Sequence, residues 1–124
     1  MKVIETKSAP AAIGPYSQAM ITGNLLFTSG QISLCPQSGE MVGSTVAEQT
    51  EQVVKNIKAI LEEAGSSMSK VVKTTCFLID MRDFAEFNSV YEKHFVSKPA
   101  RSTVAVRGLP RNAMVEVETI AELD

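Results

Sequence analysis

Arg101 is the residue of this chain best suited to bind an anion. It is the single charged side chain in residues 99–106, an otherwise apolar, strand-like run. A guanidinium presents a planar fork of N–H donors that matches a carboxylate bidentately. An arginine near the start of a buried strand therefore indicates an anion-binding pocket. The alternative is an arginine whose stem covers apolar surface while its head reaches water.

Glu116 and Glu118 are the candidates for acid–base chemistry. Residues 114–120 alternate with a period of two, which places both carboxylates on one face of a strand, roughly 6 to 7 Å apart along it. Such residues can also form the wet side of an antiparallel strand. Met114 and Ile120 share their face, and these apolar neighbours argue against a plain solvent surface.

Two shorter segments could bring donors to a ligand. Gly14-Pro15 restricts the backbone just before Tyr16, so the phenol can point at a ligand or pack in a turn. Ser29 and Gly30 interrupt an apolar strand with a residue that has no side chain. This occurs at bulges and where a ligand approaches the main chain.

The first half of the chain predicts a hairpin and a long helix. Residues 17–22 and 25–29 flank Gly23-Asn24 and are typical of two antiparallel strands joined by a two-residue turn. Thr45 and Glu48 form a capping-box pattern, after which apolar residues recur at helical spacing until Gly65. We therefore expect an amphipathic helix over this stretch.

The second half predicts strand, helix and two further strands. Residues 71–79 are β-branched and apolar, as in a central strand. Asp83 can cap the following helix, whose aromatic residues recur every three or four positions and form a core-facing stripe. Asn88 lies at the edge of that stripe. Residues 102–106 and 114–121 complete the expected sheet.

This element order predicts an α+β fold, a mixed sheet with two helices on one face. A chain of 124 residues that is 44% hydrophobic is long enough for one domain, 1–124, and too short for two ordinary ones. The second face of the sheet would then lack a cover. Oligomerisation through that face is the economical solution.

Composition argues against several classes of partner. Twelve Lys and Arg stand against fourteen Asp and Glu, a formal charge of −2 without a basic cluster, so nucleic acid is not an expected partner. The chain has neither an apolar stretch of ~20 residues nor a signal-peptide start. We therefore expect no membrane partner and a cytoplasmic location.

Metal and cofactor chemistry have little support. Cys35, Cys76 and His94 are not at the spacing of metal or redox motifs. The glycine-rich motifs that bind phosphates and dinucleotides do not occur. We expect two reduced thiols, no resident metal and no cofactor.

The segments above resemble those of the Rid family, formerly YjgF, of reactive-intermediate deaminases. The resemblance extends along essentially the whole chain, and it is carried by residues 11–16, 28–32, 72–75, 83–84, 88, 99–102 and 115–118. It implies a chorismate-mutase-like α+β fold and a homotrimer with ligand clefts between subunits. It also implies hydrolysis of 2-iminopropanoate and 2-iminobutanoate to 2-oxo acids and ammonia. These imines derive from enamines that pyridoxal-phosphate-dependent dehydratases release.

The resemblance also implies residue roles. Arg101 matches the arginine that binds the substrate carboxylate, and Glu116 matches the glutamate proposed to position the attacking water. Further positions match residues that line the family's pocket: Tyr16, Ser29, Gly30, Asn88 and Thr103.

Two departures from the family pattern stand out. Thr103 occupies a position where many relatives carry cysteine, so a thiol cannot be essential here. Lys98 stands where relatives commonly have an aromatic residue. Two other functions stay open: a non-catalytic module that binds small 2-oxo acids or other carboxylates and regulates a metabolic enzyme, and the ribonuclease activity attributed to some relatives. The latter fits poorly with the charge of −2.

Overall fold

The expected hairpin is present in the computed structural model, which describes residues 1–124. Strands β2 (Ala19–Thr22) and β3 (Leu25–Thr28) pair antiparallel, with Thr22 opposite Leu25. Gly23 between them has φ of +58°, a left-handed conformation that glycine adopts without a steric penalty. The two-residue turn is therefore confirmed.

The long helix α1 (Val46–Glu63) begins as its capping box predicts. The Thr45 side chain accepts a hydrogen bond from the Glu48 N–H, while the Glu48 carboxylate accepts one from the Thr45 N–H. After the Ala64 cap, Gly65 has φ of +82°. A start and an end with local signals explain why this helix is predictable from sequence.

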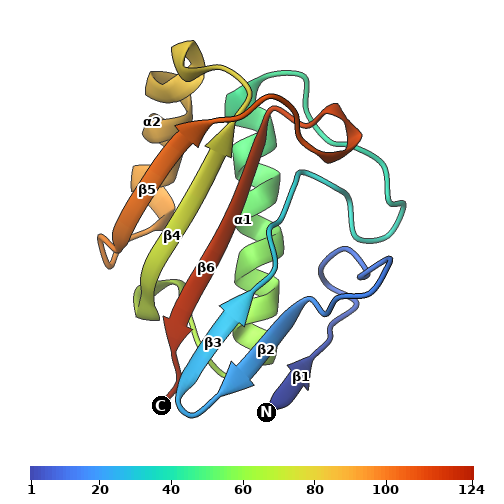
Figure 1. Ribbon diagram of the computed structural model, residues 1–124, viewed down its shortest axis with the longest axis vertical. Helices are drawn as coiled ribbons and strands as arrows, with labels where there is room; N and C mark the ends of the chain where they lie inside the picture. Colours follow the sequence, from blue (N-terminus) through green and yellow to red (C-terminus); the bar gives the residue numbers. More distant parts are fainter.

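Six strands form one mixed sheet in the order β1-β2-β3-β6-β4-β5 (Figure 1). The remaining strands are β1 (Lys2–Ile4), β4 (Val71–Leu78), β5 (Ala100–Ala105) and β6 (Val115–Glu122). All neighbours pair antiparallel except β4 and β5, which are parallel. Helix α2 (Phe84–His94) forms the crossover between those two strands.

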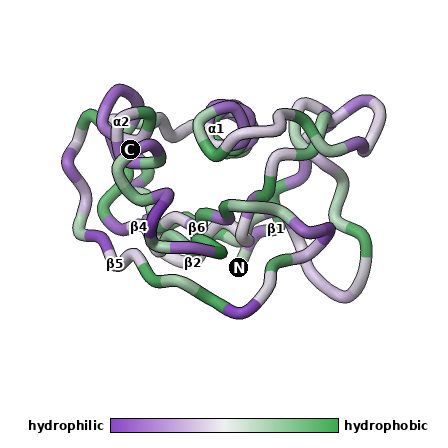
Figure 2. The backbone as a smooth tube through the Cα atoms, turned by 90° about the horizontal axis from the view of Figure 1, so that it is seen from above, coloured by the Kyte–Doolittle hydropathy of each residue, from purple (hydrophilic) through white to green (hydrophobic).

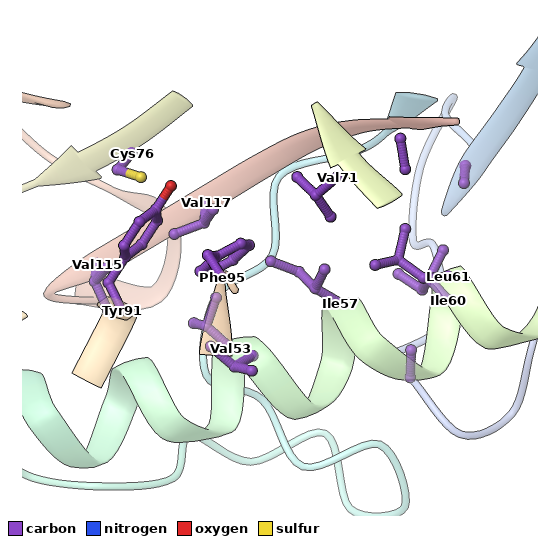
Figure 3. Close-up of a cluster of buried hydrophobic side chains, with 14 of the residues drawn as sticks. Val53, Ile57, Ile60, Leu61, Val71, Cys76, Tyr91, Phe95, Val115 and Val117 are labelled. Atoms are coloured by element: carbon purple, nitrogen blue, oxygen red, sulfur yellow. The ribbon is translucent and has the colours of Figure 1, made fainter. Parts of the chain in front are cut away.

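Both helices cover the same face of the sheet, as predicted (Figure 2). The core lies between them and the sheet, and Figure 3 shows Val53 and Ile57 of α1 pointing toward the sheet. Val115 and Val117 of β6 belong to the same buried cluster. The predicted stripe is buried at Phe87 and Tyr91 of α2 and at Phe95, its C-cap residue, and Phe84 packs against this cluster.

The opposite face of the sheet carries no helix and exposes large apolar side chains. Phe27 of β3 is 39% exposed and Val104 of β5 is 45% exposed. Register places Phe27 opposite Ile120 and Val104 opposite Phe77, and Glu116 and Glu118 are on this same face. We call this side the open face.

Three local expectations need correction. Asp83 occupies the N-cap position of α2 but makes no side-chain capping bond; instead the Asp80 side chain caps a short 3₁₀ turn by accepting from the Arg82 N–H. Strand β5 begins at Ala100, earlier than residue 102, because its pairing with β4 starts at Lys73. Strand β6 runs from Val115 to Glu122, one residue later than expected at each end.

Edge strand β1 is an element that the sequence pattern did not indicate. Its three residues are too few to show an alternating pattern, and pairing with β2 defines it. No helix of the chain is both long and apolar enough to cross a bilayer.

Candidate functional site

Gly30 and Glu116 are adjacent across the open face. Three residues after the end of β3, Gln31 pairs with Val117 of β6: its N–H donates to the Val117 carbonyl at 2.9 Å, and the Val117 N–H donates to the Gln31 carbonyl at 3.2 Å. This bridge holds Gly30 beside Glu116. A β-carbon at position 30 would lie 2.8 Å from Glu116 Cδ and closer still to Oε2. A side chain at position 30 would therefore displace the Glu116 carboxyl from its place.

Glu116 lies in an open cavity of about 740 Å³. Of the residues singled out by sequence, Tyr16, Ser29, Gly30 and Glu118 line the same cavity. Apolar side chains form much of the remaining wall: Pro10, Ala11, Ile13, Ile32 and Leu34. An acidic group thus faces a pocket with room for a small organic molecule.

Main-chain contacts hold the donors on the cavity wall. Ser29 Oγ donates to the Ser17 carbonyl at 2.5 Å, and the Ser29 N–H donates to the Gln18 carbonyl at 2.9 Å. The Tyr16 hydroxyl accepts from the Ile13 N–H at 3.3 Å, and Tyr16 is 51% exposed. The phenolic proton therefore stays available to a ligand.

Burial disfavours the ionised form of Glu116. Its pKa is raised from the ordinary glutamate value, first because the carboxyl is partly removed from water and second because Glu118 carries a like charge. Both causes strengthen this carboxylate as a base, which suits a group that accepts a proton from water.

Arg101 lies on the other side of the sheet, above α2. Its Nη1 donates to Asn88 Oδ1 at 2.7 Å. Its guanidinium carbon lies 4.6 Å from the centre of the Tyr91 ring and 5.4 Å from that of Phe84. None of the three ion pairs in the molecule includes Arg101. The guanidinium is thus oriented by a neutral amide and two rings, and its charge is available to an anion.

Thr103 lies next to Arg101 along the same face of β5. It pairs with Cys76 of β4, and its Oγ1 is buried without a hydrogen-bond partner. Buried hydroxyls are normally satisfied, so this oxygen is an exception in the fold. Burial raises the pKa of the adjacent Cys76 thiol to about 11. That thiol is therefore un-ionised at neutral pH and is not a nucleophile.

Register shows that Arg101 and Glu116 point to opposite faces of the sheet. Arg101 pairs with Thr74 of β4, whereas Glu116 pairs with Phe77. Positions 74 and 77 are an odd number of residues apart, so their side chains point to opposite sides. Thr74 is buried under α2, and its Oγ1 lies 2.7 Å from the Tyr91 hydroxyl. The predicted site residues therefore form two separate groups in one chain.

Each group is a half-site on its own face of the sheet. The carboxylate half-site consists of Tyr16, Ser29, Gly30 and Glu116. The arginine half-site consists of Asn88, Arg101 and Thr103. The first is on the open face, and the second is on the helix-covered face at β5. Because β5 is an edge strand, the arginine half-site is open to a neighbouring molecule.

Some residues at these sites were not singled out by sequence reasoning. Arg111 lines the cavity of the carboxylate half-site with φ of +58°. Asn56 is fully buried on α1 and donates to the carbonyls of Ile32 and Leu34, which anchors the chain that follows Gly30. The sequence contains one signal for Asn56: it is a polar residue directly before Ile57, within the apolar pattern of the expected helix.

The departure at Lys98 lies outside both half-sites. Lys98 lines a separate hollow of about 390 Å³ near the C-terminus, together with Ser69 and Ser97. No group of three or more His, Cys, Asp or Glu side chains is arranged to hold a metal ion.

The fold defines an α+β protein with a six-stranded mixed sheet, and comparison with known proteins gives its family. The sequence pattern of the family described as endoribonuclease L-PSP matches residues 6–123. The chain belongs to this family, which is the YjgF/Rid family that the sequence resembles.

Individual relatives that match nearly the whole of this chain support the family assignment. Reactive Intermediate Deaminase A, chloroplastic, from Arabidopsis thaliana is 50% identical over 98% of this chain and 66% of its own. A Lactococcus lactis protein whose name calls it a regulator, AldR, is 56% identical over 99% of this chain and 98% of its own. Escherichia coli TdcF, solved with bound serine, has a TM-score of 0.94 at 43% identity and covers 100% of both chains.

Proposed function

We propose that this protein hydrolyses reactive 2-imino acids to 2-oxo acids and ammonia, with 2-iminopropanoate and 2-iminobutanoate as substrates. Water adds to the C=N carbon, and the carbon–nitrogen bond of the resulting adduct then breaks. The observation that carries the proposal is the pair of half-sites. One presents an arginine without an anionic partner, and the other a half-buried carboxylate of raised pKa.

The active site is assembled from two copies of the chain. Within one copy Arg101 and Glu116 point to opposite faces of the sheet, so a small imino acid cannot contact both. The open face exposes Phe27 and Val104 and has no helix to cover it. Packing copies against this face buries those side chains and brings the arginine half-site of one copy to the cavity of another. We propose that three copies close the ring, as in the homotrimer that the family resemblance implies.

Each half-site then has a distinct task. Arg101, oriented by Asn88, binds the substrate carboxylate through its guanidinium fork. Thr103 offers its unpartnered hydroxyl to the same ligand. These groups fix one end of the substrate, which places the imine carbon at a defined position.

The carboxylate half-site supplies the proton transfers. Glu116 accepts a proton from the attacking water and passes it to the imine nitrogen, which gives a hydroxy-amine adduct. It then takes the proton of the adduct hydroxyl and delivers it to the nitrogen as the carbon–nitrogen bond breaks, which leaves the C=O group and ammonia. The main chain at Gly30 lies against Glu116 and orients the imine. Tyr16 and Ser29 line the wall next to it. Since water is the nucleophile, orientation and charge placement carry the reaction, and no covalent enzyme intermediate is needed.

Two of the relatives add independent support. The Arabidopsis relative is named as a reactive intermediate deaminase. TdcF binds serine, a molecule with a carboxylate and a nitrogen on adjacent carbons. A 2-imino acid has the same arrangement, so a pocket for one accommodates the other.

Release of 2-oxo acid in competition with a trapping reagent tests this function. A pyridoxal-phosphate-dependent threonine or serine dehydratase generates the imine in situ, and semicarbazide competes for it. We expect the wild-type protein to suppress trapping and Arg101→Ala to lose that effect, since charge-assisted pairs contribute strongly in dry pockets. Unchanged trapping with the wild-type protein would exclude these substrates.

A mixing experiment tests the shared site. Arg101→Ala and Glu116→Gln are each expected to be inactive alone. Refolded together, they form mixed assemblies in which about a quarter of the sites receive an intact arginine from one copy and an intact glutamate from another. Recovery toward that fraction supports a site between copies. Mixed assemblies without any recovery would place the site within one copy.

A second candidate function is binding without turnover, in which the protein holds a 2-oxo acid or another carboxylate and regulates a metabolic enzyme. The AldR relative, whose name calls it a regulator, favours it. Glu116 discriminates between the two functions. Ligand binding through Arg101 survives Glu116→Gln in both, whereas only an imine hydrolase loses turnover with the same substitution.

A further inference from the structure

Glu118 is a second acidic side chain on the wall of the cavity that contains Glu116. On β6, Glu116 pairs with Phe77 of β4 and Glu118 pairs with Thr75, so both side chains point to the open face. Two residues along a strand separate their backbones by about 6.7 Å. Glu116 is partly buried and Glu118 is exposed, and two carboxylates on neighbouring same-face positions of a strand repel each other.

Within one copy of the chain, the cations on this face and on the cavity wall make their contacts elsewhere. No ion pair in the molecule includes Glu116 or Glu118. Lys73 of β4 is on the same face, but its Nζ lies 3.4 Å from Ser102 Oγ. Arg111 lines the cavity, but its Nη1 donates to the Gly39 carbonyl at 3.3 Å.

The other contacts of Glu116 do not relieve the repulsion. Gly30 packs directly against the carboxyl and brings no side chain. Tyr16 is the one further ionisable group on the wall, and its hydroxyl accepts from the Ile13 N–H. Burial and the charge of Glu118 act in the same direction and raise the pKa of Glu116.

We propose that Glu118 is a positioning residue for imine hydrolysis, which acts through Glu116 and makes it a stronger base without contacting the substrate. This inference rests on the proposed function. A carboxylate beside a second negative charge holds a proton more firmly, because protonation removes the repulsion. Glu116 therefore takes a proton from the attacking water more readily than an isolated glutamate does.

The test compares three substitutions on β6. Glu118→Gln removes the charge and keeps the shape, whereas Glu118→Asp keeps the charge. Glu122→Gln removes a charge from the same face of the same strand, at a residue outside the cavity. In protein labelled with ¹³C at glutamate side-chain carboxyls, the titration of Glu116 is followed by NMR, with Glu116→Gln used for assignment.

We expect the Glu116 midpoint to move to lower pH in Glu118→Gln and to stay in place in Glu118→Asp and Glu122→Gln. The acidic limb of the kcat/KM profile should move in the same direction in Glu118→Gln, with a lower plateau. A Glu116 midpoint unchanged in Glu118→Gln overturns the proposal, as does an equal shift in Glu122→Gln. Absence of imine hydrolysis in the wild type would instead refute the proposed function, and the NMR titration still tests the coupling.

Discussion

The carboxyl of Glu116 occupies the space that a side chain at position 30 would need. A β-carbon at Gly30 would lie 2.8 Å from Glu116 Cδ and 3.1 Å from Cγ. The two residues are far apart in sequence, and the bridge between Gln31 and Val117 brings them together. This contact makes position 30 a sensitive probe of the carboxylate half-site.

Gly30→Ala should displace the Glu116 carboxylate. Gly30 does not have positive φ, so alanine fits its backbone and the clash is with Glu116 alone. We expect kcat/KM to fall about 10²-fold, as for misplaced catalytic groups, with a smaller effect on the free energy of unfolding. Gly108→Ala is the control, because nothing lies within 4 Å of a β-carbon there. Equal activities of the two variants would contradict this account.

Asn88→Asp should compete with the anionic substrate for Arg101. Arg101 Nη1 donates to Asn88 Oδ1 at 2.7 Å, and a carboxylate at the same place forms an ion pair with the guanidinium. We expect KM to rise about tenfold or more, which corresponds to roughly 1.4 kcal/mol of binding. Asn88→Ala removes the hydrogen bond without adding a charge and should raise KM less. A larger effect of alanine than of aspartate would argue against electrostatic competition.

Glu116→Gln should stabilise the protein at neutral pH. The pKa of Glu116 is raised in the fold, chiefly by burial. The protonated Glu116 side chain therefore makes its full contribution to the free energy of unfolding below the pKa of the unfolded state. That contribution is lost as the pH rises through the pKa of the folded state. We expect Glu116→Gln to raise the free energy of unfolding, relative to the wild type, by more at pH 7 than at about pH 4. Urea unfolding at one fixed protein concentration measures this difference, and a pH-independent difference would contradict the prediction.

Thr74→Val should destabilise the fold without changing the ring that faces Arg101. Thr74 Oγ1 and the Tyr91 hydroxyl are 2.7 Å apart in the core. Valine keeps the shape and leaves the tyrosine hydroxyl unpaired, which costs about 1–3 kcal/mol. Urea unfolding measures the loss. KM should change little, because the Tyr91 ring still lies 4.6 Å from the Arg101 guanidinium.

Features with local causes were predictable from the sequence. The turn at Gly23-Asn24 and the capping box of Thr45 each depend on a few neighbouring residues. Strand β1 was missed because three residues contain too little pattern. The capping bond expected at Asp83 is absent, and Asp80 makes one at the preceding 3₁₀ turn instead. The sequence does not distinguish the two, because both are acidic residues at the start of a helical segment.

In the candidate site, too, some features follow from the local sequence and others depend on long-range pairing. Alternation along β6 determined by itself that Glu116 and Glu118 share a face, because the period of two is a property of any strand. Which face Arg101 occupies was decided by the tertiary structure, since it depends on the pairing of Arg101 with Thr74 across a parallel crossover. A shift of one residue in that register would turn Arg101 to the open face beside Glu116. Long-range strand pairing selects the register, and that pairing separates the arginine from the carboxylate in each chain.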